Sequence, residues 1–419
     1  MLNYLRQLRA FTRDARLYLL STALYGFALG FQFLFLNLYV LSLGYDQAFV
    51  GVLASVPAQV TAASAIPIGL FLARIGFRRS LLLGGFLQLL ALIGWSFPFG
   101  RTSLILSSAL SGLGASLVFV CSGPLMVATS GPRERTHLFS VQFGLTTFAW
   151  VAASLIGGNL PVLFGRLLAV PVEGAASYRA ILLVAAGFVV LSLVPLRRMR
   201  PHRGRGRTWV GRAELKPYRS LMGKLVLVQF VGSLGAGFLM PFVNVFYRLR
   251  FEISDSLLGG LFAASSLTVG IATLLVPLLV ERVGKIKTVV LTQLISLPFL
   301  ILMGFGLAFS WSAAGYLVRT ALMNMGAPVL GAFAMGAVAS GIRPIAASLL
   351  ALAWNAGWAV SSFASGWVQM EAGFQPIFVV TGSLYLAGSL LVYRFFRGVP
   401  EGEGAELIEE VVAEEEIRI

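Results

Sequence analysis

One arginine stands inside an otherwise apolar run, and a charge in that setting needs a chemical partner. Arg319 lies in YLVRTALMNMGAP, roughly four residues from the middle of its run, or about 6 Å along a helix. A guanidinium removed from water is costly unless an anion or hydrogen-bond acceptors meet it. Arg319 therefore either contacts an anionic or hydroxyl-rich ligand or gates the outer half, or is satisfied by helix-end carbonyls or tyrosines.

Uncharged polar residues recur on three helical faces. These faces hold Tyr25, Gln32 and Tyr39; Gln229, Ser233, Asn244 and Tyr247; and Trp354, Asn355 and Trp358. Such faces either line a cavity or hold helices together by hydrogen bonds. The predicted cavity residues are Tyr25, Gln32, Gln229, Asn244, Arg319, Asn355 and Trp358.

Carboxylates and histidines avoid the middle of the apolar runs. Nine acidic residues precede the acidic C-terminal segment, all in loops or at run ends, and the two histidines are His137 and His202. The chain lacks H-E-x-x-H, a phosphate-binding G-x-x-x-x-G-K-[ST] loop and a nucleophile–base–acid set. We therefore expect neither an enzyme nor an ATP-driven pump, and no cofactor or metal. A proton-coupled step would need a carboxylate near a run end, such as Asp46, Glu134 or Glu281.

The elements that position these residues follow from composition. The 419 residues are 58% hydrophobic and only 12% charged, with a mean hydropathy of +0.86, so too little polar surface exists to coat a water-soluble protein. Spanning helices need about 20 apolar residues, which predicts an all-α polytopic membrane protein. Twelve such runs occur, at about 17–44, 47–72, 80–100, 102–127, 137–164, 175–197, 218–247, 255–280, 287–308, 311–336, 344–369 and 375–396.

Basic residues predict the orientation. With both termini cytoplasmic, 26 of the 32 Lys and Arg residues face inside and five face outside, as the positive-inside rule expects for a cell membrane. The net charge of +15 is spread over short clusters between apolar runs, which argues against nucleic-acid binding. The predicted segments are a cytoplasmic N-terminus (1–16), a six-helix bundle (17–197), a basic linker (198–217), a second six-helix bundle (218–397) and an acidic cytoplasmic tail (398–419).

An internal repeat relates the two bundles. A shift of 208 residues superposes FLARIGFRRSLLL (71–83) on LVERVGKIKTVVL (279–291), which places Arg74, Gly76 and Arg79 on Arg282, Gly284 and Lys287. The same shift superposes Arg135 on Arg343, Trp150 on Trp358 and Gly158 on Gly366. One offset shared by separate segments predicts two pseudo-symmetric bundles. Each glycine would allow a tight helix–helix turn, with basic residues facing the negative helix end.

These segments resemble a known signature. GLFLARIGFRR, which contains Gly69, Arg74, Gly76, Arg78 and Arg79, resembles the G-x-x-x-D-R-x-G-R-R motif of the major facilitator superfamily, and PLLVERVGKIK resembles its second copy. The resemblance implies that the acidic position pairs with a helix N-terminus of the other half and closes the cytoplasmic side. The first copy has Ala73 there, but the second has Glu281, which is expected near Arg135 to His137.

The resemblance also implies a function. We expect a monomeric secondary transporter that moves a small molecule across the bilayer by rocker-switch alternating access, with the site between the two bundles and H⁺ or Na⁺ as a coupling ion. The substrate class stays open. Efflux of amphipathic compounds suits a cavity without fixed acids, although AASLIGGN (152–159) lacks the Gly-Pro of the drug-antiporter motif. Uptake or exchange of a sugar or small organic anion suits Gln32, Asn244, Asn355 and Arg319. A membrane receptor or polytopic enzyme is the remaining alternative.

Overall fold

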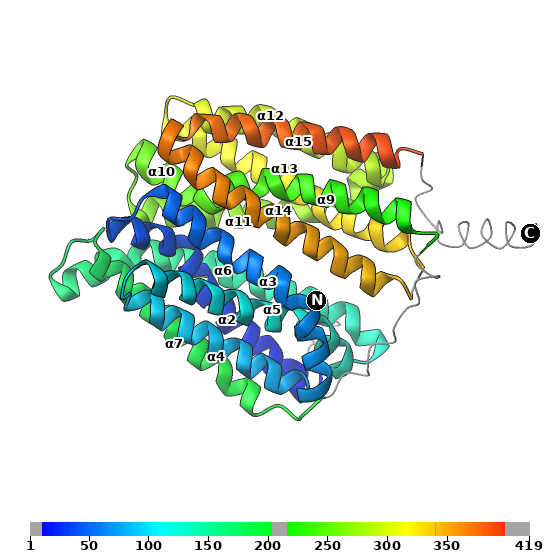
Figure 1. The fold of residues 1–419 in the computed structure, drawn as a ribbon, viewed down its shortest axis with the longest axis horizontal. Coiled ribbons are helices and arrows are strands. Elements are labelled where there is room, and N and C mark those ends of the chain that lie inside the picture. Colours follow the sequence, from blue (N-terminus) through cyan, green and yellow to red (C-terminus); the bar gives the residue numbers. More distant parts are fainter. Residues whose placement is uncertain (1–10, 203–215, 340, 399–419) are drawn as a thin grey trace, which may run out of the picture. The chain divides into compact units, whose positions relative to one another are not determined.

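The computed structural model describes residues 11–202, 216–339 and 341–398, and every regular element in these ranges is a helix (Figure 1). Twelve helical stretches there are long and apolar enough to cross a membrane. The predicted all-α polytopic fold is therefore confirmed. The chain divides into two compact units, Met1–Arg207 with Phe242–Ser266, and Thr208–Pro241 with Leu267–Ile419.

The first unit contains six long helices. They are α2 (Arg13–Ser42), α3 (Gln47–Ile75), α4 (Phe77–Ser96), α5 (Arg101–Thr129), α6 (Pro132–Leu168) and α7 (Ala175–Arg197). Helix α2 packs against α6 and α7, while α4 packs against α5 and α7. The short helix α10 (Val243–Phe251) and the first part of α11 (Asp255–Val283) also belong to this unit, so residues from the second half of the sequence complete it.

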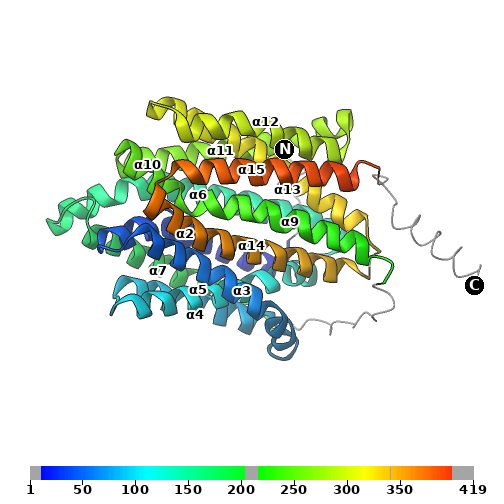
Figure 2. The same ribbon diagram turned by 45° about the horizontal axis from the view of Figure 1, so that its top comes forward.

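The second unit is built from the remaining helices. They are α9 (Arg219–Leu239), the rest of α11, α12 (Lys285–Phe305), α13 (Phe309–Gly336), α14 (Arg343–Ala372) and α15 (Gln375–Phe396). Helix α9 lies beside α14 in both views (Figures 1 and 2) and also contacts α15. Helix α12 packs between α13 and α15. Apolar side chains of α9, α11, α12, α13 and α15 form one buried core.

The seventh spanning stretch differs from the prediction of one helix over 218–247. Helix α9 ends at Leu239, a 3₁₀ turn covers Met240–Phe242, and α10 begins at Val243. Pro241 lies in this turn; proline lacks an N–H and clashes with the carbonyl four residues earlier, so it disfavours a continuous α-helix. The break also coincides with the division of the chain, since Pro241 belongs to the second unit and Phe242 to the first.

The two basic segments adopt the same local geometry. Gly76 caps α4 with φ 79° and ψ 162°, and Gly284 caps α12 with φ 85° and ψ 164°. Positive φ is readily accessible only to glycine, which explains its presence at both turns. Helices α4 and α12 begin 208 residues apart, and so do α5 and α13, so the offset in the sequence is also an offset between structural elements.

Candidate functional site

Arg319 is buried inside the second unit. Its side chain is fully inaccessible, and its guanidinium carbon lies 5.3 Å from the centre of the Tyr385 ring on α15. None of its three guanidinium nitrogens makes a hydrogen bond of normal geometry within the described residues. The stacking of a cation on an aromatic face is worth about 2 kcal/mol or somewhat more when desolvated, less than the several kcal/mol that burying an unpaired charge costs. The guanidinium therefore has hydrogen-bonding capacity left for an anion, beside its contact with Tyr385.

The surroundings of Arg319 add further unpaired polar atoms. Tyr385 packs against Gly235 of α9, where an added Cβ would lie 3.2 Å from the ring. Thr381 lies one turn before Tyr385 on the same face of α15, and its buried hydroxyl has no partner among the described residues. Helices α13 and α15 thus bring a cation, a phenol and a hydroxyl to one buried region beside α9, a set that suits a carboxylate or phosphate.

At the equivalent position of the first unit, uncharged side chains are joined by hydrogen bonds. A shift of 208 residues places Arg319 on Ser111, whose hydroxyl donates to Gln88 Oε1 over 2.9 Å. Gln88 in turn donates to Gln32 Oε1 over 2.6 Å. Tyr39 follows the same pattern, because its hydroxyl donates to the Ser96 carbonyl. Two of the three polar residues on this face of α2 therefore bind α4. Their contacts favour a role in holding helices together.

The predicted polar face of the seventh helix is divided by the break. Asn244 lies in the first unit, where its amide donates to the Leu34 carbonyl over 2.9 Å and accepts from Asn37 over 3.3 Å. Gln229 and Ser233 lie on α9 in the second unit, and Ser233 donates to the Trp354 carbonyl. The four residues expected on one face therefore do not form one stripe, since the 3₁₀ turn ends α9 between them.

The remaining predicted cavity residues differ in their contacts. Asn355 donates to the Ala351 carbonyl of its own helix over 2.8 Å. The rings of Trp354 and Trp358 lie 6.1 Å apart, and the backbone of Trp358 contacts Gly237 of α9. Tyr25 has a buried hydroxyl without a partner in the described residues. The structure thus brings Arg319 together with Tyr385 rather than with the other predicted cavity residues.

The signature residues lie at helix ends. Arg78 donates to the Arg197 carbonyl over 2.6 Å and so caps the C-terminus of α7, where a cation is favourable. Arg79, Arg282 and Lys287 have exposed side chains. Gly69, Arg74 and Arg135 lie in helical stretches whose side chains are outside the described part. The expected contact of Glu281 with the start of α6 would join the two units and stays a prediction.

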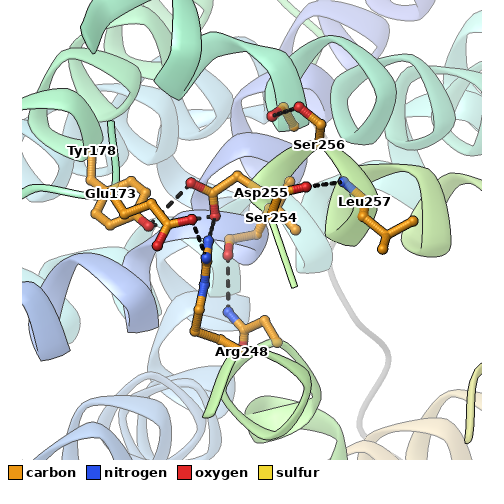
Figure 3. Close-up of polar contacts among 10 residues, drawn as sticks. Glu173, Tyr178, Arg248, Ser254, Asp255, Ser256 and Leu257 are labelled. Carbon is orange, nitrogen blue, oxygen red and sulfur yellow. Dashed lines mark hydrogen bonds and ion pairs between the residues drawn. The ribbon is translucent and has the colours of Figure 1, made fainter. Parts of the chain in front are cut away.

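An ionic cluster was not predicted from the sequence. In the first unit, Arg248 of α10 pairs with both Asp255 of α11 and Glu173, and its guanidinium points at the two carboxylates (Figure 3). The Tyr178 hydroxyl of α7 donates to Asp255 Oδ2 over 3.2 Å. The Asp255 side chain is 1% exposed and that of Arg248 13%, whereas Glu173 is 52% exposed. The cluster therefore has a buried pair at its centre and one solvated member.

A close helix crossing lies beside this cluster. An added Cβ at Gly158 of α6 would lie 2.8 Å from the Asp255 carbonyl, and one at Gly259 of α11 would lie 2.3 Å from the Ser154 carbonyl. The Ser256 hydroxyl donates to the Gly158 carbonyl over 3.1 Å. The cluster and the crossing join α6 and α7 to α10 and α11, which are far apart in sequence. The signal in the sequence was faint: Arg248 and Asp255 flank the short loop between two apolar runs.

Comparisons with known proteins agree with this architecture. The family model described as Major Facilitator Superfamily matches residues 18–224 and 225–414. The uncharacterized MFS-type transporter YttB of Bacillus subtilis (strain 168) is 27% identical over 186 residues, which span 43% of this chain and less than half, 45%, of that protein.

Solved structures extend the likeness to nearly the whole chain. The nucleoside transporter NupG superposes with a TM-score of 0.72 at 12% identity, covering 92% of this chain and 98% of that one. A D-xylose-proton symporter gives a TM-score of 0.72 at 14% identity, covering 94% and 98%. A bacterial homologue of the human lysosomal transporter Spinster gives 0.67 at 15%, covering 91% and 94%. At these identities the likeness shows a shared fold.

Proposed function

The chain belongs to the major facilitator superfamily and is a multi-pass, non-enzymatic membrane transporter, and from that premise we propose that it carries a small molecule bearing an anionic group. The observation that carries this proposal is the buried guanidinium of Arg319, whose nitrogens have no hydrogen-bond partner among the described residues. We propose secondary active transport by rocker-switch alternating access, performed by a monomer in the cell membrane with both termini cytoplasmic.

The charge of Arg319 favours an anion over the other substrate classes. A neutral sugar would offer hydroxyls but no countercharge, and a cationic amphipath would repel the guanidinium. A carboxylate or phosphate can accept two parallel N–H donors from arginine, which replaces the lost hydration. The side chain is long and flexible, so a change of rotamer can swing the guanidinium away from Tyr385 and towards a ligand. Efflux of amphipathic compounds thus becomes the second candidate.

A coupling ion would act away from Arg319. H⁺ or Na⁺ coupling generally uses a carboxylate, and the carboxylates of the described residues lie at helix ends or in loops. We therefore propose that the coupling step occurs near one membrane face. Asp255 joins Asp46, Glu134 and Glu281 as a candidate, because it is buried and contacts both Arg248 and Tyr178.

Transport in proteoliposomes tests the proposal. Wild type, Arg319→Lys and Arg319→Gln are reconstituted under an imposed pH gradient with labelled monocarboxylates, organic phosphates, sugars and lipophilic cations. We expect uptake or exchange of an anionic class in the wild type, at least tenfold slower transport in Arg319→Gln, and partial retention in Arg319→Lys. Unchanged anion transport in Arg319→Gln, or transport of lipophilic cations only, would refute the anion proposal. Tyr385→Phe keeps the ring and removes the hydroxyl, so it separates the contribution of the phenol from that of the guanidinium.

A further inference from the structure

A basic cavity opens at one end of the second unit. Its volume is about 560 Å³, and it lies between the first turns of α9 and the last turns of α15. Three cations, Lys216, Arg219 and Lys224, line it together with Pro217, Ser220, Gly223, Leu227 and Phe395. By the predicted orientation this end of α9 faces the cytoplasm, so the cavity lies at the inner surface of the membrane.

The three cations of this cavity make no ion pair within the described residues. Within the same part of the chain, no carboxylate lines the cavity. The Lys224 ammonium lies 5.8 Å from the centre of the Phe395 ring, which holds the charge against the cavity wall. The start of α9 adds the positive end of its helix dipole. Each contribution favours an anionic ligand.

The deeper end of the cavity is apolar. Leu227 lies eight residues beyond Arg219 on α9, about 12 Å deeper along the helix, and its side chain is 43% exposed. Phe395 lines the cavity from α15. A ligand that fills both ends must be amphipathic, with an anionic head at the rim and hydrocarbon against Leu227 and Phe395. A soluble phosphate would occupy only the rim.

We propose that this cavity binds an anionic phospholipid of the inner leaflet, with its phosphate among Lys216, Arg219 and Lys224 and an acyl chain against Leu227 and Phe395. Basic cavities between helices at the cytoplasmic side are suited to such headgroups. The site lies within one unit and does not depend on the transported substrate. The acidic segment 401–419 also begins shortly after α15 and is the competing occupant that the experiment must distinguish.

Titration of the purified full chain with dioleoyl phosphatidylglycerol, followed by native mass spectrometry, tests this site. Replacing each cation is expected to weaken binding about fivefold, so the triple variant Lys216→Gln/Arg219→Gln/Lys224→Gln loses roughly a hundredfold. The matched control is the triple variant Arg198→Gln/Arg394→Gln/Arg397→Gln, which removes the same charge from the same membrane side outside the cavity. Its affinity for phosphatidylglycerol should stay within about threefold of that of the wild type.

A second variant leaves the charge untouched. An added Cβ at Gly223 would meet nothing within 4 Å, so Gly223→Leu can place a bulky side chain in the cavity without disturbing the helix packing. We expect at least a tenfold loss of phosphatidylglycerol binding at unchanged net charge, which decides the matter even if the triple variant fails to fold. Phosphatidylcholine, inorganic phosphate and a chain ending at residue 398 complete the comparison.

The outcomes separate the possible occupants. The proposal stands if phosphatidylglycerol binds more tightly than phosphatidylcholine, is not displaced by millimolar inorganic phosphate, and is lost in Gly223→Leu. It is overturned if Gly223→Leu binds as wild type does, if the matched triple variant loses as much as the cavity variant, or if inorganic phosphate displaces the lipid. It is also overturned if phosphatidylglycerol binds only after residues 399–419 are removed, because the acidic tail is then the occupant.

Discussion

The two carboxylates of the ionic cluster in the first unit should contribute unequally to the free energy of unfolding, and this difference can be measured. Asp255→Asn removes the buried partner of Arg248, whose side chain is only 13% exposed, and leaves that charge with the solvated Glu173 alone. Breaking a buried pair at one side costs about 3–5 kcal/mol. Glu173 is 52% exposed, and an exposed ion pair is worth about 0–1 kcal/mol, so Glu173→Gln should cost less than about 1 kcal/mol.

The double variant Arg248→Gln/Asp255→Asn separates the attraction between the two charges from the cost of leaving one of them buried without a partner. Once both charges of the pair are gone, no buried uncompensated charge remains, so the double variant should lose less than Asp255→Asn alone and far less than the sum of the single changes. The expected coupling energy is at least about 2 kcal/mol. Tyr178→Phe removes one donor to Asp255 and should cost about 1–2 kcal/mol.

The measurement is reversible unfolding in mixed detergent micelles, followed by tryptophan fluorescence, with the free energy of unfolding compared across the variants. Two results would refute the reasoning. One is a loss in Glu173→Gln equal to or greater than that in Asp255→Asn. The other is strict additivity of Arg248→Gln and Asp255→Asn, which would mean that the two side chains do not interact.

Two further predictions concern helix packing in the first unit. Gly259→Ala places a Cβ 2.3 Å from the Ser154 carbonyl and should lower the unfolding free energy by about 1–3 kcal/mol. Gly260→Ala meets nothing within 4 Å and should be neutral or stabilising by up to about 1 kcal/mol. The melting temperatures of the two variants check this, and equal values would contradict the tight crossing. Gln88→Ala leaves Gln32 without its donor and should lower the unfolding free energy by about 1–3 kcal/mol while leaving substrate affinity unchanged. A loss of substrate affinity without a loss of stability would instead indicate that Gln32 contacts the substrate.

The sequence predicted what local chemistry determines. Twelve spans follow from apolar length, and the glycine turns at Gly76 and Gly284 follow from a repeat that can be read from two short segments. Pro241 was visible too, but a proline within a long apolar run often only kinks a helix, so the length of the run favoured one element. The structure has a 3₁₀ turn there.

Partners distant in the chain could not be predicted. Glu173 and Arg248 are 75 residues apart, and nothing in either segment names the other. The stripe of Tyr25, Gln32 and Tyr39 was correctly seen as one helical face, but periodicity does not say which neighbour that face meets. For Gln32 and Tyr39 the neighbour is α4. Arg319 could be recognised from the energetic cost of a charge within an apolar run. Its contact with Tyr385 could not be predicted, because it depends on how α13 packs near α15.

The repeat has a consequence for how such a chain can acquire a new ligand. Gln88 and Ser111 correspond, at the same offset of 208 residues, to Ser296 and Arg319. The first copy thus has its larger side chain, Gln88, on α4 and its smaller one on α5. The second copy reverses the sizes, with the smaller side chain on α12 and the larger, Arg319, on α13. In the first copy the two positions are joined by the Ser111–Gln88 hydrogen bond, whereas in the second the exchange of sizes introduces a charge. The neutral copy then preserves the scaffold, while its twin is free to specialise.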